Sequence, residues 1–409
     1  MNKVIYVYLA LIFFVYLIFC SILYIIAKEI YENRFDKKVK KLYRTFGSEV
    51  LKQVENIKNN KELSKIDLDY IREKLKYKTY EKAFNDMIVF LNKDKNNYQH
   101  IRKYMENFQD YIEKSIKKYK KATNIKKIYG VFLLGEYRLN NYFINEFLIN
   151  SLNTDSIHLT FNILNSIAKI GNIQLFIESL KYISSKNKYI NNKLFIDIID
   201  NFNGDMYKLN KELFTNLDSF NDTIKCTIIN HFENCKYADI KEELLQKLIN
   251  NNTDKEVKLS IIRYFNSVKY DKAKTVLLDI LKNAQWECRA LSAKSLAKYY
   301  CEETYNGLLE SITDKNWYVR LNSAISLLSF NVDNEKLVEV VLGKNDKYSK
   351  EILFYVMFMK NKISYEKYEE ITKEQLTIKE IETIDDYHND EKNNFYNKTL
   401  KKEREVVNK

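Results

Sequence analysis

The chain has 409 residues, of which 45% are hydrophobic, and it contains seven glycines and no proline. Turns between strands depend on glycine and proline, so this composition argues against a β-rich fold and favours long helices joined by short polar loops. An A+T-rich genome would bias the composition in the same way, so the all-α prediction has to rest on periodicity. The net charge of +12 comes from 67 Lys and Arg against 55 Asp and Glu. The excess is modest and both signs are interspersed. A basic protein can bind nucleic acid or an anionic membrane surface, and the apolar span described next makes the membrane surface the simpler partner.

The first predicted element is a membrane-spanning helix over residues 4–27, a stretch that carries no charge. A helix of this length reaches roughly 36 Å, enough to cross a hydrocarbon core of about 30 Å. The alternative is a cleaved signal peptide, whose apolar region would be about 7–15 residues long and followed by small residues. The run here is longer and is followed by Lys28 and Glu29, so we expect a retained anchor.

Charge predicts the orientation of this anchor. Only Lys3 precedes the span, whereas residues 28–44 carry seven Lys and Arg. The positive-inside rule then keeps the C-terminal side in the cytoplasm of a single-pass protein of the cell membrane. This basic flank is also expected to contact anionic headgroups, although a stop-transfer signal alone would explain it.

Residues 28–121 are charged and rich in helix formers, and we interpret them as a helical stalk or cap. Ser64 followed by Asp67 resembles a helix N-cap. Apolar residues from Tyr98 to Tyr119 recur at helical spacing and predict one long helix.

An internal repeat begins farther along the chain. A shift of 31 residues places Trp286 on Trp317 and Arg289 on Arg320, and it also places Leu277 on Leu308. Period and phase persist over at least four units, with one step of 33. Each unit is predicted to be two amphipathic helices that cannot bury their apolar faces alone, so neighbouring units must stack.

These units resemble the HEAT-repeat family, in particular its short bacterial HEAT-like (PBS-lyase-type) members. Asp314, Val319, Arg320 and Ala324 fit the family pattern well, while Asn283 and Arg289 fit it less well. The resemblance is specific over residues 220–345 and weaker over 123–220, where residues 129–137 and 161–171 look like degenerate first helices. It implies an all-α, α-solenoid fold for residues 122–376.

The resemblance also implies a ladder of Asp and Arg side chains between repeats, with Arg320 beside the acidic turn at Asp314. Trp286 and Trp317 recur at one repeat position, and packing is favoured over a binding surface for them. The candidate ladder or partner-surface residues are Trp286, Arg289, Asp314, Trp317 and Arg320.

Little in the sequence points to chemistry. None of the four histidines pairs at metal-ligand spacing, and the glycines build no phosphate loop. Asp67 and Asp69 resemble the Asp-x-Asp of some sugar-nucleotide transferases, but they stand in a helix first turn, which favours acidic residues anyway. The five scattered cysteines predict reduced, buried thiols. We expect no catalytic residue, cofactor, metal or small-molecule substrate, and a charged, disordered tail over residues 377–409.

The leading hypothesis is therefore a non-catalytic scaffold that binds a protein partner at the membrane. One alternative is a nucleic-acid-binding solenoid of the kind that excises alkylated bases. The other is an outward-facing envelope or adhesion component, which the charge bias opposes.

Overall fold

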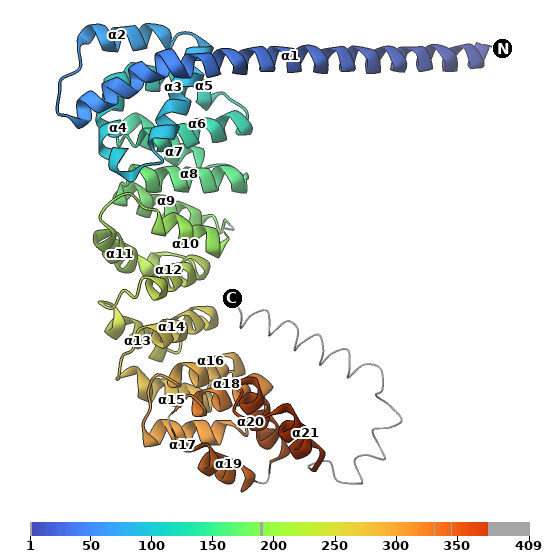
Figure 1. Ribbon diagram of the computed structural model, residues 1–409, viewed down its shortest axis with the longest axis vertical. Helices are drawn as coiled ribbons and strands as arrows, with labels where there is room; N and C mark the ends of the chain where they lie inside the picture. The colour runs from blue at the N-terminus through green and yellow to red at the C-terminus, as the bar shows by residue number, and fades with distance from the viewer. Residues whose placement is uncertain (1, 189–190, 331, 345, 375–409) are drawn as a thin grey trace. The chain divides into compact units, whose positions relative to one another are not determined.

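A computed structural model describes residues 2–188, 191–330, 332–344 and 346–374, and the predicted tail over 377–409 lies outside these residues. Every regular element in the described part of the chain is a helix, with 21 α-helices and three short 3-10 turns (Figure 1). The helices pack as stacked pairs, as in an α-solenoid, so the predicted fold class is confirmed. The chain divides into two compact units, residues 1–231 and residues 232–409.

The first unit begins with one very long helix, α1 (Asn2–Lys58), which contains the whole predicted span and continues past it without a break. From Ile5 to Arg34 its described side chains are exposed, apart from the half-buried Cys20. From Val39 onward one face of the helix is buried, including Phe46 and Val50, and packs against α3 and α4. The second half of α1 therefore belongs to the packed core.

The remaining helices of the first unit are α2 (Lys65–Lys74), α3 (Lys78–Leu91), α4 (Tyr98–Met105), α5 (Gln109–Lys120), α6 (Asn124–Tyr137), α7 (Tyr142–Ser151), α8 (Ile157–Ile170), α9 (Ile173–Ser185), α10 (Asn192–Asp200), α11 (Met206–Thr215) and α12 (Asp222–Asn234), which runs across the boundary. They form two layers. In one layer α3, α6, α8 and α10 pack in succession, and in the other α5 packs on α7 and α9 on α11. Contacts of α5 with α6 and α7 cross the expected division at residues 121 and 122, so the helices before this division continue into the stack.

The structure corrects the single long helix expected from Tyr98 to Tyr119. Helix α4 ends at Met105, a 3-10 turn covers Glu106–Phe108, and α5 follows. The side-chain amide of Asn107 donates to the carbonyls of Lys103 and Tyr104, which competes with continuation of the helix. The expected N-cap at Ser64 is present, since its hydroxyl accepts from the backbone N–H of Ile66.

Close helix contact within the first unit depends on small residues. A Cβ at Gly135 of α6 would lie 2.8 Å from the Cα of Ser166 of α8. The hydroxyl of Ser166 donates to the carbonyl of Val131 at 2.8 Å, so the two helices are joined by a buried hydrogen bond. The two degenerate first helices expected over residues 129–137 and 161–171 are thus α6 and α8, which pack against each other.

The second unit contains α13 (Lys241–Ile249), α14 (Lys255–Ser267), α15 (Ala273–Asn283), α16 (Trp286–Leu296), α17 (Glu302–Ser311), α18 (Trp317–Leu327), α19 (Asn334–Leu342), α20 (Lys347–Met359) and α21 (Tyr365–Glu374). Helices α14, α16, α18 and α20 pack in one layer, and α13, α15 and α17 in the other. Buried hydroxyls join successive members of the first layer, because Ser295 donates to the carbonyl of Ile262 and Ser326 to that of Ala293. The repeat unit seen in the sequence is this pair of helices.

The cysteines only partly follow the sequence prediction. Cys226 and Cys288 are buried, as expected. Cys20 and Cys301 are half-buried, and Cys235 is exposed.

Candidate functional site

Three features of the described residues offer a surface to another molecule: the apolar half of α1, the turns between repeats of the second unit, and open pockets between helices. Among the described residues, no three His, Cys, Asp or Glu side chains gather closely enough to hold a metal ion.

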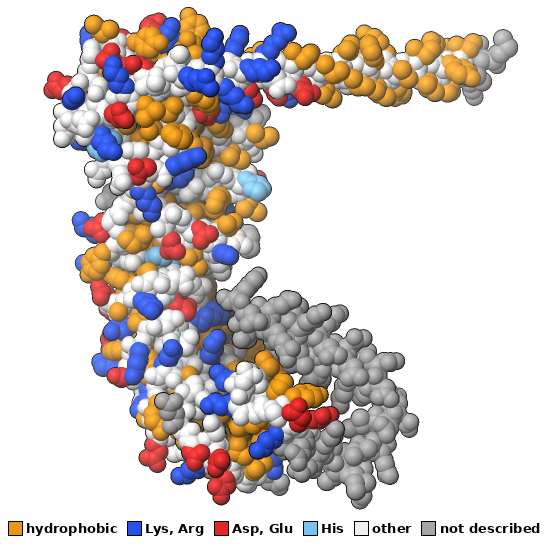
Figure 2. Space-filling model, viewed as in Figure 1, with side chains coloured by type: hydrophobic (Ala, Val, Ile, Leu, Met, Phe, Trp, Pro, Cys, Tyr) orange, Lys and Arg blue, Asp and Glu red, His pale blue; other side chains and the backbone are white. Residues whose placement is uncertain are grey.

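Helix α1 is, within the described ranges, the one helix long and apolar enough by composition to cross a membrane, and none of its apolar stretch is buried. Figure 2 shows its hydrophobic side chains uncovered, with Lys and Arg side chains gathered where the helix reaches the packed helices. The seven basic residues between Lys28 and Arg44 are all exposed. A membrane anchor and a signal sequence both have this character.

The turn before α18 holds a two-pronged charge pair that joins two repeats of the second unit. Arg289 of α16 donates from Nε to Asp314 Oδ2 at 2.7 Å and from Nη2 to Oδ1 at 2.8 Å. The remaining edge of the guanidinium donates to the carbonyl of Ala284. The two side chains are 20% and 13% exposed, so solvent screens the pair only in part.

The electrostatics of Asp314 follow from these contacts. Burial alone would raise the pKa of its carboxyl group, but the Arg289 guanidinium and the backbone N–H of Asn316 outweigh burial and hold this pKa below its ordinary value. The carboxylate is therefore stabilised in its charged form, which is the form that bridges the repeats.

Arg320 does not take the role expected from its spacing to Asp314. Its Nη1 donates to the main-chain carbonyls of Asp314 and Lys315, at 2.8 and 3.2 Å, instead of to the carboxylate. The physical reason is that the fork of Arg289 already occupies both carboxylate oxygens. The structure thus brings Arg289 and Asp314 together across repeats, and Arg320 braces the backbone of the same turn.

One repeat earlier, the equivalent positions hold Lys258 and Asn283, which cannot form a guanidinium–carboxylate fork. Asn283 instead donates to Asp279 on its own helix. An open cavity of about 510 Å³ lies at this position, and Lys258 and Asn283 both line it.

An aromatic ridge runs over the N-terminal ends of α16, α18 and α20. We define it by four residues: Trp286, Trp317, Tyr318 and Tyr348, which are 41%, 39%, 54% and 59% exposed. The ring of Tyr318 stacks on Trp286 with centroids 5.7 Å apart and meets Trp317 edge-on at 5.0 Å. Arg320 continues the ridge, since its guanidinium carbon lies 5.2 Å from the ring centre of Tyr348.

Helix capping places this ridge at the surface. Asn316 accepts from the backbone N–H of Tyr318 at 2.9 Å, so α18 begins with two aromatic residues in its first turn. The sequence favoured packing for the tryptophans, and the structure leaves both rings partly uncovered. Tyr318 and Tyr348 were missed, although the 31-residue shift from Trp317 leads directly to Tyr348.

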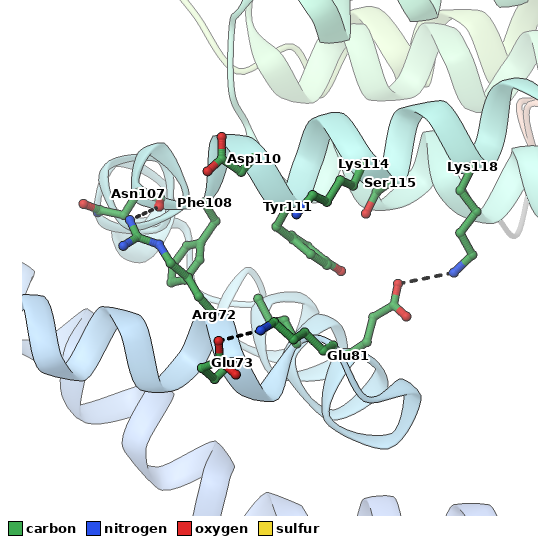
Figure 3. Close-up of a pocket in the computed structure, with 12 residues that line it drawn as sticks. Arg72, Glu73, Glu81, Asn107, Phe108, Asp110, Tyr111, Lys114, Ser115 and Lys118 are labelled. Atoms are coloured by element: carbon green, nitrogen blue, oxygen red, sulfur yellow. Dashed lines mark hydrogen bonds and ion pairs between the residues drawn. The ribbon is translucent and has the colours of Figure 1, made fainter.

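A smaller pocket of about 310 Å³ lies between α2 and α5 in the first unit (Figure 3). Arg72 donates to the carbonyl of Asn107 at 2.9 Å, and Lys118 pairs with Glu81 at 3.5 Å across the opening. Lys76 is likewise paired, with Glu73. Because most of its charges are already satisfied, this pocket offers little to a charged ligand.

Comparison with known proteins agrees with the geometry of the second unit. The family model for HEAT repeats matches residues 238–329, so this part of the chain consists of HEAT repeats. The matched residues include helices α13 to α18 and the pair formed by Arg289 and Asp314. They also include Trp286, Trp317 and Tyr318 of the aromatic ridge. No curated protein matches the sequence of the chain.

Proposed function

We propose that the chain is a membrane-anchored scaffold: residues 4–27 span the membrane, and the stacked helices hold a protein partner on its cytoplasmic side. HEAT repeats typically mediate protein binding, which supports the general role. The proposal assigns no reaction to the chain. The basic flank over residues 28–44 supports both the orientation and contact with anionic lipid.

The single observation that carries the binding proposal is the aromatic ridge. Partly exposed Trp and Tyr side chains that recur at one repeat position provide large contact area at low cost in conformational entropy, and these residue types are enriched at binding hot spots. A ridge repeated over three helices suits an extended partner segment that follows the stack.

The charges around the ridge favour a protein over nucleic acid. Lys255 pairs with Glu287 at 3.0 Å, and Arg289 is held by Asp314, so these two cations of α14 and α16 are already neutralised. A surface that binds nucleic acid gains most of its affinity from cations that neutralise phosphates.

Photo-crosslinking tests the proposal. A photoreactive phenylalanine analogue at Tyr318 of the full chain, in its native membranes, is expected to capture a protein. The same analogue at Leu342 at the end of α19, which is 44% exposed, is the matched control. Replacing Trp286 or Trp317 with alanine should reduce the yield at Tyr318 by on the order of tenfold, as at a hot spot. Equal yields at the two positions, or an adduct whose added mass is removed by nuclease, would overturn it.

A further inference from the structure

A third pocket, distinct from the aromatic ridge, lies in the first unit, where the start of α4, the end of α6, α8 and the connection from α10 to α11 meet. Its volume is about 710 Å³. Apart from Phe202 and Tyr98, its lining is polar: Lys95, Asn96, Gln99, Arg138, Asn165, Lys169, Asp200, Asn201 and Asn203. A pocket with so few apolar groups suits a strongly hydrated ligand.

Arg138 is the unusual residue in this lining. It is only 4% exposed, and its backbone is left-handed with φ at 55°, a conformation that costs energy for a residue other than glycine. Its Nε donates to the side-chain oxygen of Asn92 at 2.9 Å, and its Nη1 donates to the carbonyl of Lys169 at 3.1 Å. The guanidinium stacks on Tyr98 with its carbon 3.2 Å from the ring centre. These contacts fix the fork in one orientation.

The partners of Arg138 are all neutral, whereas a buried cation is normally paired with a carboxylate. The charge of Glu136 favours the charged form of Arg138, but the Glu136 carboxylate is bound by Lys169. Burial outweighs this charge and lowers the pKa of Arg138. A fixed, largely buried guanidinium that forms no ion pair with the described residues is a costly arrangement, and such arrangements concentrate at functional sites.

The polar groups around Arg138 indicate which kind of ligand could pair with its positive charge. Lys95 is exposed at the rim and adds a second cation, while the carboxylate of Asp200 is engaged by the Nδ1 of His231 at 2.7 Å. Asn201 and Asn203 already donate to main-chain carbonyls. The side-chain amides of Asn96, Gln99 and Asn165 make no hydrogen bond within the described residues, so they can bind hydroxyl groups of a ligand.

We propose that this pocket binds a small hydroxyl-rich anion, whose carboxylate or phosphate group lies against Arg138 and Lys95 and whose hydroxyls contact the amides of Asn96, Gln99 and Asn165. The anion is bound and not transformed. The site extends the sequence analysis, which expected no small-molecule substrate, and it does not depend on the scaffold proposal.

Calorimetry on the full chain in detergent tests the site with four probes: glucose 6-phosphate, glucuronate, inorganic phosphate and neutral glucose. We expect saturable binding of glucose 6-phosphate or glucuronate at millimolar concentration, and the stronger of the two identifies the anionic group. Inorganic phosphate should bind more weakly, and glucose should not bind. If neither sugar anion binds, or if glucose binds as well as they do, the proposal is wrong.

Variants locate the binding. Arg138→Gln should weaken the stronger anion by about tenfold or more, because a charge-assisted fork is lost. Lys114→Gln, in the pocket between α2 and α5, is the matched control and should leave the affinity unchanged. If Arg138→Gln does not fold, a double variant of two exposed residues, Lys95→Gln with Gln99→Ala, replaces it. This double variant should weaken binding of the anion about tenfold without changing the melting temperature. Retained affinity in the variants that fold would show that the anion binds elsewhere.

Discussion

Arg289 and Asp314 are joined across two repeats by a two-pronged contact, with N–O distances of 2.7 and 2.8 Å. Arg289 lies on α16, and Asp314 lies in the turn that leads into α18. The pair therefore ties the position of one helix to the start of the next helix in the same layer. Trp317 and Tyr318 of the aromatic ridge follow this turn directly.

The first prediction is that Arg289 and Asp314 are energetically coupled. Each single alanine substitution leaves a partly buried partner without its counter-charge, so each should lower the free energy of unfolding by about 1–3 kcal/mol. The double variant should lose less than the sum of the two, with a coupling energy of about 1–2 kcal/mol. Urea denaturation followed by circular dichroism measures this cycle. Strict additivity would show that the pair contributes nothing to stability.

Arg320 supplies the matched control. Its Nη1 binds the carbonyls of Asp314 and Lys315, which remain when the side chain of Asp314 is removed. We therefore predict that Arg320→Ala and Asp314→Ala are additive to within roughly 0.5 kcal/mol. Strong coupling between these two would instead favour the Arg320–Asp314 pair that the sequence suggested.

The third prediction concerns pH. Although burial opposes it, the Arg289 guanidinium lowers the pKa of Asp314 in the folded state below the value of about 3.9 for an unfolded Asp. A depressed carboxyl pKa gives stability that is present above the unfolded pKa and is lost as pH falls through the folded pKa. The stability difference between the natural chain and Asp314→Asn should be constant near neutral pH and should shrink below about pH 4. Denaturant titrations over this pH range measure it, and a difference that grows on acidification would contradict the assignment.

The fold was predictable because the repeat is carried by particular residues. Trp286 and Trp317, together with the aligned leucines, fix the length and phase of the helix pair, and the HEAT repeats over residues 238–329 follow from them. The partner of Asp314 was not predictable. The spacing along the chain suggests Arg320 as the partner of Asp314, because the two residues are close in sequence. Only the packing of α16 shows that Arg289 binds the carboxylate instead.

The pocket at Arg138 had no signal in the sequence. Left-handed helix ends are usually marked by glycine or asparagine, and here an arginine occupies the position. Its contacts with Tyr98 and Asn92 join residues about 40 positions apart, which periodicity within one helix cannot predict.

The fourth prediction is that the apolar half of α1 is dispensable for folding. Residues 5–27 contribute no buried side chain among those described, whereas the buried face of α1 begins at Val39. A chain without residues 1–27 should be soluble, helical and cooperative in thermal melting. Extending the deletion to residue 48 removes Val39 and Phe46 from the core and should destabilise the first unit by several kcal/mol. Precipitation or loss of helical signal in the shorter deletion would show that anchor and stack do not fold separately.

The last prediction tests the orientation proposed for the chain in the membrane. By the positive-inside rule, the charge difference between Lys3 and the seven basic residues of 28–44 predicts that the stacked helices lie in the cytoplasm. Thr313 is exposed in the turn beside Asp314, so a Thr313→Cys variant presents a thiol to solvent on whichever side of the membrane the repeats lie. In intact cells this thiol should resist a membrane-impermeant maleimide, and after permeabilisation it should react at full rate. The exposed Cys235 and the half-buried Cys20 and Cys301 are replaced by serine in the background, so that the signal comes from position 313. Full reaction in intact cells would place the repeats outside and favour the envelope or adhesion alternative.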